Sequence, residues 1–157
     1  MNHTQNPLKY WDEITEGDPV PTVTMAVTLK RVILDAASTQ DYFPGHHNQA
    51  YARQQGQKDI YLNTMAIEGF IDRVATDWAG PHTFIRKRQM QMRASIYAGD
   101  TMRGEGKVDK CYQDNGRNLV DISILISTDS GPCVPASLTL ELPRRAADPM
   151  NEIRRVD

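Results

Sequence analysis

Apolar and polar side chains begin to alternate at Val20. Val23, Met25 and Val27 share one parity, and threonines occupy the other. This period of two is typical of a strand with one buried face. Thr28 is a competent N-cap for a short helix over residues 30–39, whose apolar stripe consists of Val32, Ile33, Ala36 and Ala37.

The strongest helical pattern lies in the stretch NTMAIEGFIDRVATDW, residues 63–78. Its apolar side chains fall at i, i+3, i+4, i+7 and i+11 and so share one face: Ile67, Phe70, Ile71, Val74 and Trp78. Asn63 is suited to capping the first turn, and Gly80-Pro81 ends the pattern. The sequence therefore predicts one long helix with a wide apolar face.

The rest of the chain predicts strands over residues 83–97, 100–111, 119–127 and 134–142. QDNGR at 113–117 and TDSGP at 128–132 are typical hairpin turns, and Gly104 and Gly106 indicate a bulge or a close approach. The predicted order is strand, short helices, long helix, then a four-strand antiparallel meander. We expect an α+β hotdog fold, in which an antiparallel sheet wraps around the long helix and the first strand pairs with a later one.

Length and composition predict a single domain, because 157 residues with 39% hydrophobic content suit one core. We place it at residues 20–142, between an irregular lead-in (1–19) and a polar tail (143–157). A net charge of −2 gives no basic field for nucleic acid. Without a membrane-length apolar run or a signal-like start, we expect a cytoplasmic protein with no membrane contact.

Candidate chemistry concentrates in the turn QDYFPGHHN, residues 40–48, where Pro44-Gly45 can bend Asp41 toward His46. A carboxylate and an imidazole can hold one water and move its protons, since imidazole exchanges protons near neutral pH. The alternative is a polar surface turn. We expect His47 to be structural or exposed and no metal site here, because no third well-placed His or Cys accompanies the turn. Cys111 and Cys133 lack metal or disulfide spacing and are expected to be buried, reduced thiols.

The segment DYFPGH resembles the motif of the MaoC-like (R)-specific enoyl-CoA hydratases, an Asp, four residues and a His ahead of the hotdog helix. The usual form is close to D-F-N-P-x-H, and Phe43 replaces the usual Asn. The combination of D-x4-H-H, G-x-K-D-I and T-D-W-A-G-P is most similar to the small MaoC-like subunits of heteromeric hydratases that act on steroid side-chain enoyl-CoA thioesters. The likeness spans residues 20–142.

This resemblance implies that Asp41 activates a water and that His46 orients it and shares proton delivery. It implies that backbone N–H groups at Asn63 or Thr64 stabilise the thioester oxygen, although the family commonly has a glycine there. No metal or redox cofactor is implied. The basic cluster Arg86, Lys87 and Arg88 is a candidate contact for coenzyme A phosphates, or else an ordinary solvated strand end.

Two other functions remain open at this point. A hotdog thioesterase would use a helix carboxylate, for which Glu68 is the candidate. A non-catalytic acyl-CoA-binding subunit would only complete a partner's pocket. In each case one hotdog unit leaves a sheet edge open, so we expect a homodimer or a heteromer with a second hotdog subunit.

Overall fold

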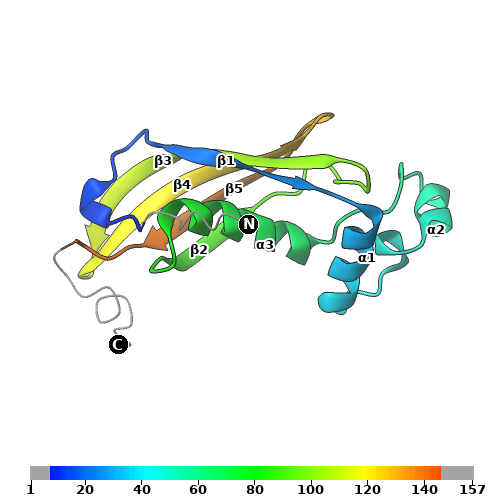
Figure 1. Ribbon diagram of the computed structural model, residues 1–157, viewed down its shortest axis with the longest axis horizontal. Coiled ribbons are helices and arrows are strands. Elements are labelled where there is room, and N and C mark those ends of the chain that lie inside the picture. The colour runs from blue at the N-terminus through cyan, green and yellow to red at the C-terminus, as the bar shows by residue number, and fades with distance from the viewer. Residues whose placement is uncertain (1–7, 146–157) are drawn as a thin grey trace, which may run out of the picture.

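The computed structural model describes residues 8–145 as an antiparallel five-stranded sheet that curves around one long helix, α3 (Figure 1). The strand order across the sheet is β1-β3-β4-β5-β2. The strands are β1 (Pro19–Ala26), β2 (Phe84–Met90), β3 (Thr101–Asp114), β4 (Arg117–Thr128) and β5 (Gly131–Glu141). The helices are α1 (Leu29–Ser38), α2 (Gln49–Gln54) and α3 (Thr64–Ala79), with 3-10 turns η1 (Trp11–Glu13) and η2 (Pro44–His46).

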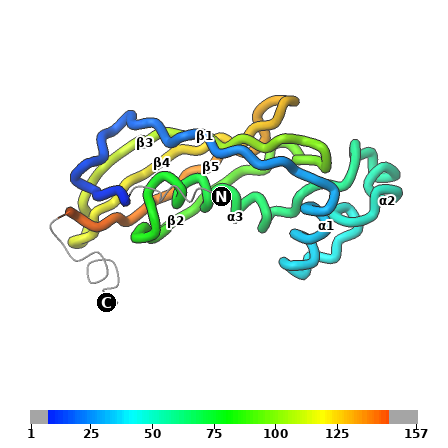
Figure 2. Tube along the Cα trace, in the orientation of Figure 1, coloured from blue at the N-terminus to red at the C-terminus, as the bar shows by residue number. Residues whose placement is uncertain are grey.

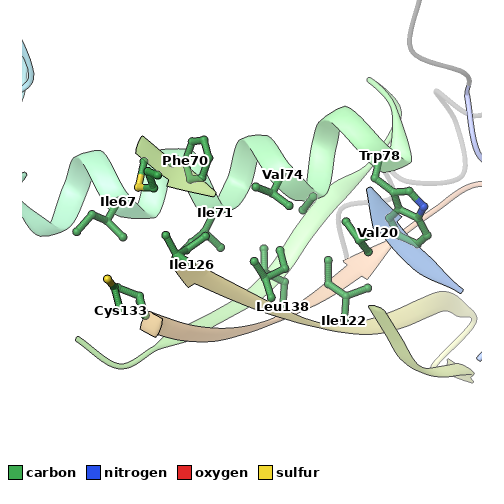
Figure 3. Packing of buried hydrophobic residues seen from close by; sticks show 14 of the residues in the cluster. Val20, Ile67, Phe70, Ile71, Val74, Trp78, Ile122, Ile126, Cys133 and Leu138 are labelled. Carbon is green, nitrogen blue, oxygen red and sulfur yellow. The ribbon is translucent and has the colours of Figure 1, made fainter. Parts of the chain in front are cut away.

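Helix α3 forms the core with the inner face of the sheet. Asn63 caps it by accepting a hydrogen bond from the Ala66 N–H, and Gly80 ends it with a φ of 91° that favours glycine. The five predicted apolar side chains of this helix are all buried. They point onto sheet residues such as Ile122, Ile126 and Leu138 (Figure 3). The predicted long central helix is confirmed.

The two glycines of β3 are places of close approach, as the sequence predicts. A Cβ atom at Gly104 would lie 2.6 Å from Val74 Cγ2 on α3. One at Gly106 would lie 2.2 Å from the carbonyl oxygen of Ser123 on β4. Glycine therefore lets the helix and the neighbouring strand approach β3 closely.

The predicted four-strand meander is wrong in one connection. β3, β4 and β5 form consecutive hairpins, whereas β2 pairs with β5 at the far edge of the sheet. The first strand does pair with a later one, because β1 lies beside β3. The crossover follows from α3, which fills the concave face and carries the chain across it before β2 begins (Figure 2).

Strand β2 ends at Met90, seven residues before the predicted end at 97. The N–H groups of Gln91 and Arg93 still donate to β5 carbonyls, at Pro135 and Cys133. The chain then leaves the sheet and pairs with residues 60–62, through Leu62 N–H to Ile96 O and Ala98 N–H to Ile60 O. Ile96 is nevertheless buried and belongs to the core cluster, which accounts for the apolar alternation that continues past Met90.

Helices α1 and α2 lie beyond the end of the sheet, beside the start of α3 (Figure 2). The Thr28 cap is confirmed, since its side chain accepts from the Arg31 N–H. Val32 and Ala36 are buried, but Ile33 and Ala37 are exposed, so the predicted apolar stripe is only half correct. Because α1 lies beyond the end of the sheet, only the face that carries Val32 and Ala36 is buried against the rest of the protein.

The segment before β1 packs against the core through Trp11 and the buried Ile14, and the Trp11 indole donates to the Leu119 carbonyl. Residues 1–7 of the predicted lead-in and 146–157 of the predicted tail lie outside the described residues. Cys133 is buried as expected, whereas Cys111 is only partly buried, and both are unpaired thiols. Within residues 8–145, no helix is long and apolar enough to cross a membrane.

Candidate active site

The turn between α1 and α2 brings Asp41 and His46 together, as the sequence predicts. The Asp41 N–H donates to the Ala36 carbonyl at the end of α1, and η2 folds the next residues back. Asp41 Oδ2 then lies 3.3 Å from His46 Nε2. The Asp41 side chain is 29% exposed, so the pair opens to solvent on the carboxylate side.

The other nitrogen of His46 is held by the backbone. His46 is 7% exposed, and its Nδ1 lies 2.8 Å from the carbonyl oxygen of Tyr61. A carbonyl can only accept a hydrogen bond, so Nδ1 carries a proton. Nε2 is therefore the nitrogen free to exchange a proton, and it is the one that faces Asp41.

Tyr61 is a site residue that sequence reasoning missed. Its N–H donates to the Gly45 carbonyl, its own carbonyl accepts from His46, and its ring meets the imidazole edge-on with centroids 5.1 Å apart. Burial raises the pKa of the Tyr61 hydroxyl, and the charges of Tyr51, Tyr97 and Asp41 add to the rise. Tyr61 lies 15 residues beyond His46, directly after the G-x-K-D-I segment. Its contact with His46 Nδ1 comes from the backbone carbonyl, which every residue type has, so the sequence carried no direct signal for this role.

Gly45 explains how the turn can pack so closely. A Cβ atom there would lie 2.6 Å from Phe43 Cε1 and 2.8 Å from Tyr61 Oη. Any larger residue would displace one of these rings. Phe43, which replaces the Asn of the usual motif, also packs edge-on against His46 at 5.5 Å.

The start of α3 is tied to the same turn. The buried Asn63 donates from its side-chain amide to Thr39 Oγ1 at 2.6 Å, and Thr39 lies two residues before Asp41. The first-turn N–H groups of a helix have no intrahelical acceptor, and the helix dipole favours negative charge there. Asn63 Oδ1 accepts a hydrogen bond from the Ala66 N–H. The N–H groups of Thr64 and Met65 are therefore the first-turn donors that a bound ligand could use. The proposed role of Asn63 and Thr64 as backbone donors stays a prediction.

The basic cluster on β2 is largely engaged within the protein. Arg86 forms an ion pair with Glu141, and Arg88 forms ion pairs with Glu68 and Asp72. The hydrogen bond to Asp72 raises the pKa of Arg88 further. Lys87 is exposed. A contact of this cluster with coenzyme A phosphates stays a prediction, and two of its three cations already have carboxylate partners.

The other residues considered for a chemical role, Glu68 and His47, form contacts within the protein that do not involve the Asp41–His46 pair. Glu68, the thioesterase alternative, is held 2.9 Å from Arg88. His47 is exposed, and its Nε2 lies 3.1 Å from the Tyr42 carbonyl, in keeping with a structural role. Within the described part of the chain, no three His, Cys, Asp or Glu side chains gather closely enough to hold a metal ion.

A curved antiparallel sheet around α3, with a carboxylate and an imidazole facing each other in the turn between α1 and α2, gives the chain the architecture of a hotdog protein. No protein-family model matches the chain. It is 29% identical over 111 residues to the 3-oxo-4,17-pregnadiene-20-carboxyl-CoA hydratase beta subunit of Mycobacterium tuberculosis, covering 71% of this chain and 83% of that one.

Solved structures of other proteins have the same fold as this chain. A chain of the ChsH1-ChsH2 complex from Mycobacterium tuberculosis matches with a TM-score of 0.75 and 28% identity, over 81% of this chain and 97% of that one. The unliganded R-hydratase PhaJ1 from Pseudomonas aeruginosa matches with a TM-score of 0.78 and 20% identity, over 87% and 86%. The predicted hotdog fold and the predicted resemblance to MaoC-like (R)-hydratases are confirmed.

Proposed function

We propose that the protein is an enoyl-CoA hydratase, or the catalytic subunit of one, that adds water across the α,β double bond of a 2-enoyl-CoA thioester. One observation carries the proposal: Asp41 Oδ2 and His46 Nε2 lie 3.3 Å apart in the turn that the Asn63–Thr39 hydrogen bond ties to the start of α3. The similarity to a hydratase subunit and to a solved hydratase complex supports it.

The geometry suits the chemistry of hydration. Asp41 takes a proton from a water held by the pair, and the water oxygen bonds to the β-carbon. The charge that develops on the thioester oxygen is stabilised by the N–H groups of the first turn of α3. The proton taken from water returns to the α-carbon through the Asp41–His46 Nε2 contact. Hydroxyl and hydrogen thus both end on the substrate, and the enzyme is unchanged.

The acyl group is proposed from the relative, whose name describes a steroid side-chain thioester. Tyr42 and Phe43 support a bulky apolar acyl group, because both are exposed directly beside Asp41. We also propose that the protein works in the cytoplasm, as its unpaired thiols suit a reducing compartment. Its assembly is proposed to be a homodimer or a heteromer with a second hotdog subunit.

The decisive experiment is Asp41→Asn, which keeps the shape of the side chain but removes the base. We expect hydration of a 2-enoyl-CoA, followed by loss of the conjugated thioester absorbance, to fall by roughly 10²–10⁴-fold. The far-UV circular dichroism spectrum should stay unchanged, since Asp41 is at the surface. Wild-type turnover in a folded Asp41→Asn protein would refute the assignment.

Glu68→Gln is the matched control for the thioesterase alternative. It removes a carboxylate that Arg88 already neutralises, so hydration should continue at a rate close to wild type. Offered a saturated acyl-CoA, the wild-type protein should release no free thiol. Rapid release of coenzyme A that disappears in Glu68→Gln would instead identify a thioesterase.

A further inference from the structure

We propose that a cavity beside Lys58 and Tyr97 binds the phosphate groups of the substrate's coenzyme A portion. The inference rests on the proposed function, because it concerns the substrate of that same site. It replaces the Arg86–Arg88 cluster with a different cation as the principal phosphate contact.

The cavity lies where the β4–β5 hairpin meets the segment that follows β2. Its volume is about 270 Å³, and its lining includes Lys58, Ser95, Tyr97, Asp100, Thr128 and Ser130. One cation, its partner Asp100 and the hydroxyl groups of Ser95, Thr128 and Ser130 surround the same space, whereas the Tyr97 hydroxyl already donates to Gln57. Phosphate oxygens are acceptors only, and they are recognised by ammonium and hydroxyl donors of this kind.

Lys58 is held in place at the rim of this cavity. Its Nζ lies 3.3 Å from Asp100 Oδ1 and 5.8 Å from the centroid of the Tyr97 ring. Asp100 is itself fixed, because its Oδ2 accepts from the Tyr97 N–H at 2.8 Å. An ammonium has three donors, and one directed at Asp100 leaves two for a ligand. With its side chain 65% exposed, Lys58 can still reach one.

A row of rings connects this cavity to the catalytic pair. Tyr61 meets His46 with centroids 5.1 Å apart, and Tyr97 meets Tyr61 at 6.2 Å. The backbone joins the same two segments through the Tyr61–Tyr97 bridge and the hydrogen bonds flanking it. The cavity wall and the catalytic turn are therefore parts of one ordered surface.

The length of this row suits the ligand. The pantetheine arm between the thioester sulfur and the first phosphate has about as many bonds as a tetrapeptide backbone. Its extended reach is therefore roughly 13–14 Å. The steps along the row from the imidazole to the Lys58 ammonium are 5.1, 6.2 and 5.8 Å. These steps sum to 17.1 Å, which is an upper limit for the straight-line separation. An extended arm together with a charge-assisted contact of about 3 Å at the ammonium just spans that distance.

The test compares Lys58→Gln with Lys87→Gln, an exposed lysine of the rival cluster, and with Lys58→Arg, which keeps the charge. Each variant is assayed for hydration of an enoyl-CoA and of the matching N-acetylcysteamine thioester, which lacks phosphate. Binding of free coenzyme A is measured by titration calorimetry. We expect Lys58→Gln to raise KM for the CoA thioester and Kd for coenzyme A about tenfold, as for the loss of one charge-assisted contact. We expect kcat for the CoA thioester and KM for the N-acetylcysteamine thioester to stay at their wild-type values.

Lys58→Arg should restore most of the affinity, and Lys87→Gln should change little. The proposal is overturned if Lys58→Gln binds coenzyme A with the wild-type Kd, or if its KM rises equally for the two thioesters. It is also overturned if Lys87→Gln raises the Kd for coenzyme A more than Lys58→Gln does. It is also overturned if the wild-type protein does not bind coenzyme A. If coenzyme A binds and Lys58→Gln weakens it while no enoyl thioester is hydrated, the phosphate site stands and the proposed function fails.

Discussion

Asp59 is a carboxylate outside the Asp41–His46 pair that organises the loop leading to Tyr61. Gln49 Nε2 donates to both of its oxygens, at 3.0 and 3.1 Å, and the Ile60 N–H donates to Oδ1 at 2.7 Å. The hydrogen bond from Gln49, then that from Ile60, holds the pKa of Asp59 below its ordinary value of 3.8. A lowered pKa means that the ionised form stabilises the fold, so this contribution is present above pH 3.8 and is lost as the pH falls through the folded pKa.

Gln49→Ala tests this linkage. At neutral pH we expect the free energy of unfolding, from urea denaturation, to fall by about 1 kcal/mol, because one charge-assisted hydrogen bond on a partly exposed group is lost. The difference from wild type should shrink as the pH is lowered below 3.8, where Asp59 becomes protonated. Gln54→Ala, at an exposed position of the same helix, is the control and should show no such pH dependence. A difference that is constant with pH would contradict the assignment.

The sequence located the candidate pair but not what holds it. Asp41 and His46 are five residues apart, and a Pro-Gly bend joins them, so local geometry alone brings them together. Tyr61 and Lys58 reach the site through pairing between residues 60–62 and 96–98. That pairing depends on where the chain leaves the sheet, and no local pattern records it.

A helix or strand was predictable from the sequence wherever a single neighbouring element buries one of its faces along its whole length. The face of α3 and the alternation in β4 follow directly from such burial. Prediction failed where the partner changes or is absent, as at the end of β2 and on the exposed side of α1. Two glycines allow this dependence on the partner to be measured: Gly104 on β3, which faces α3, and Gly69 on α3, which faces no other element.

Gly104 and Gly69 should respond in opposite directions to the same added methyl group. A Cβ at Gly104 would meet Val74 Cγ2 at 2.6 Å and Phe70 Cε1 at 3.1 Å, so Gly104→Ala should destabilise the protein by about 1–3 kcal/mol. A Cβ at Gly69, in the middle of α3, would meet no side chain and no other element within 4 Å. Gly69→Ala should therefore stabilise by about 0.5–1 kcal/mol through helix propensity. Urea denaturation measures both, and equal effects would contradict the close packing of α3 on β3.

At the scale of the whole molecule, the sheet has two unlike edges. β1 forms one edge and contains Pro19 and Pro21, which have no N–H to donate. β2 forms the other edge and contains no proline. Proline on an edge strand discourages pairing with another chain. Sequence patterns could not assign these roles in advance, because they depend on β2 pairing with β5 rather than with β3.

The β2 edge should therefore be where a second hotdog unit adds. The Gln91 N–H donates to Pro135 on β5, so by the alternation of an antiparallel strand the Met90 N–H points to the open edge. Met90→Pro removes this outward donor and leaves the inward bonds in place, whereas Met90→Ala removes only the side chain. We expect light scattering to show a dimer for the protein expressed alone and for Met90→Ala, but a shift toward monomer for Met90→Pro with its circular dichroism retained. A wild-type monomer, or a Met90→Pro dimer as stable as wild type, would contradict an interface at the β2 edge.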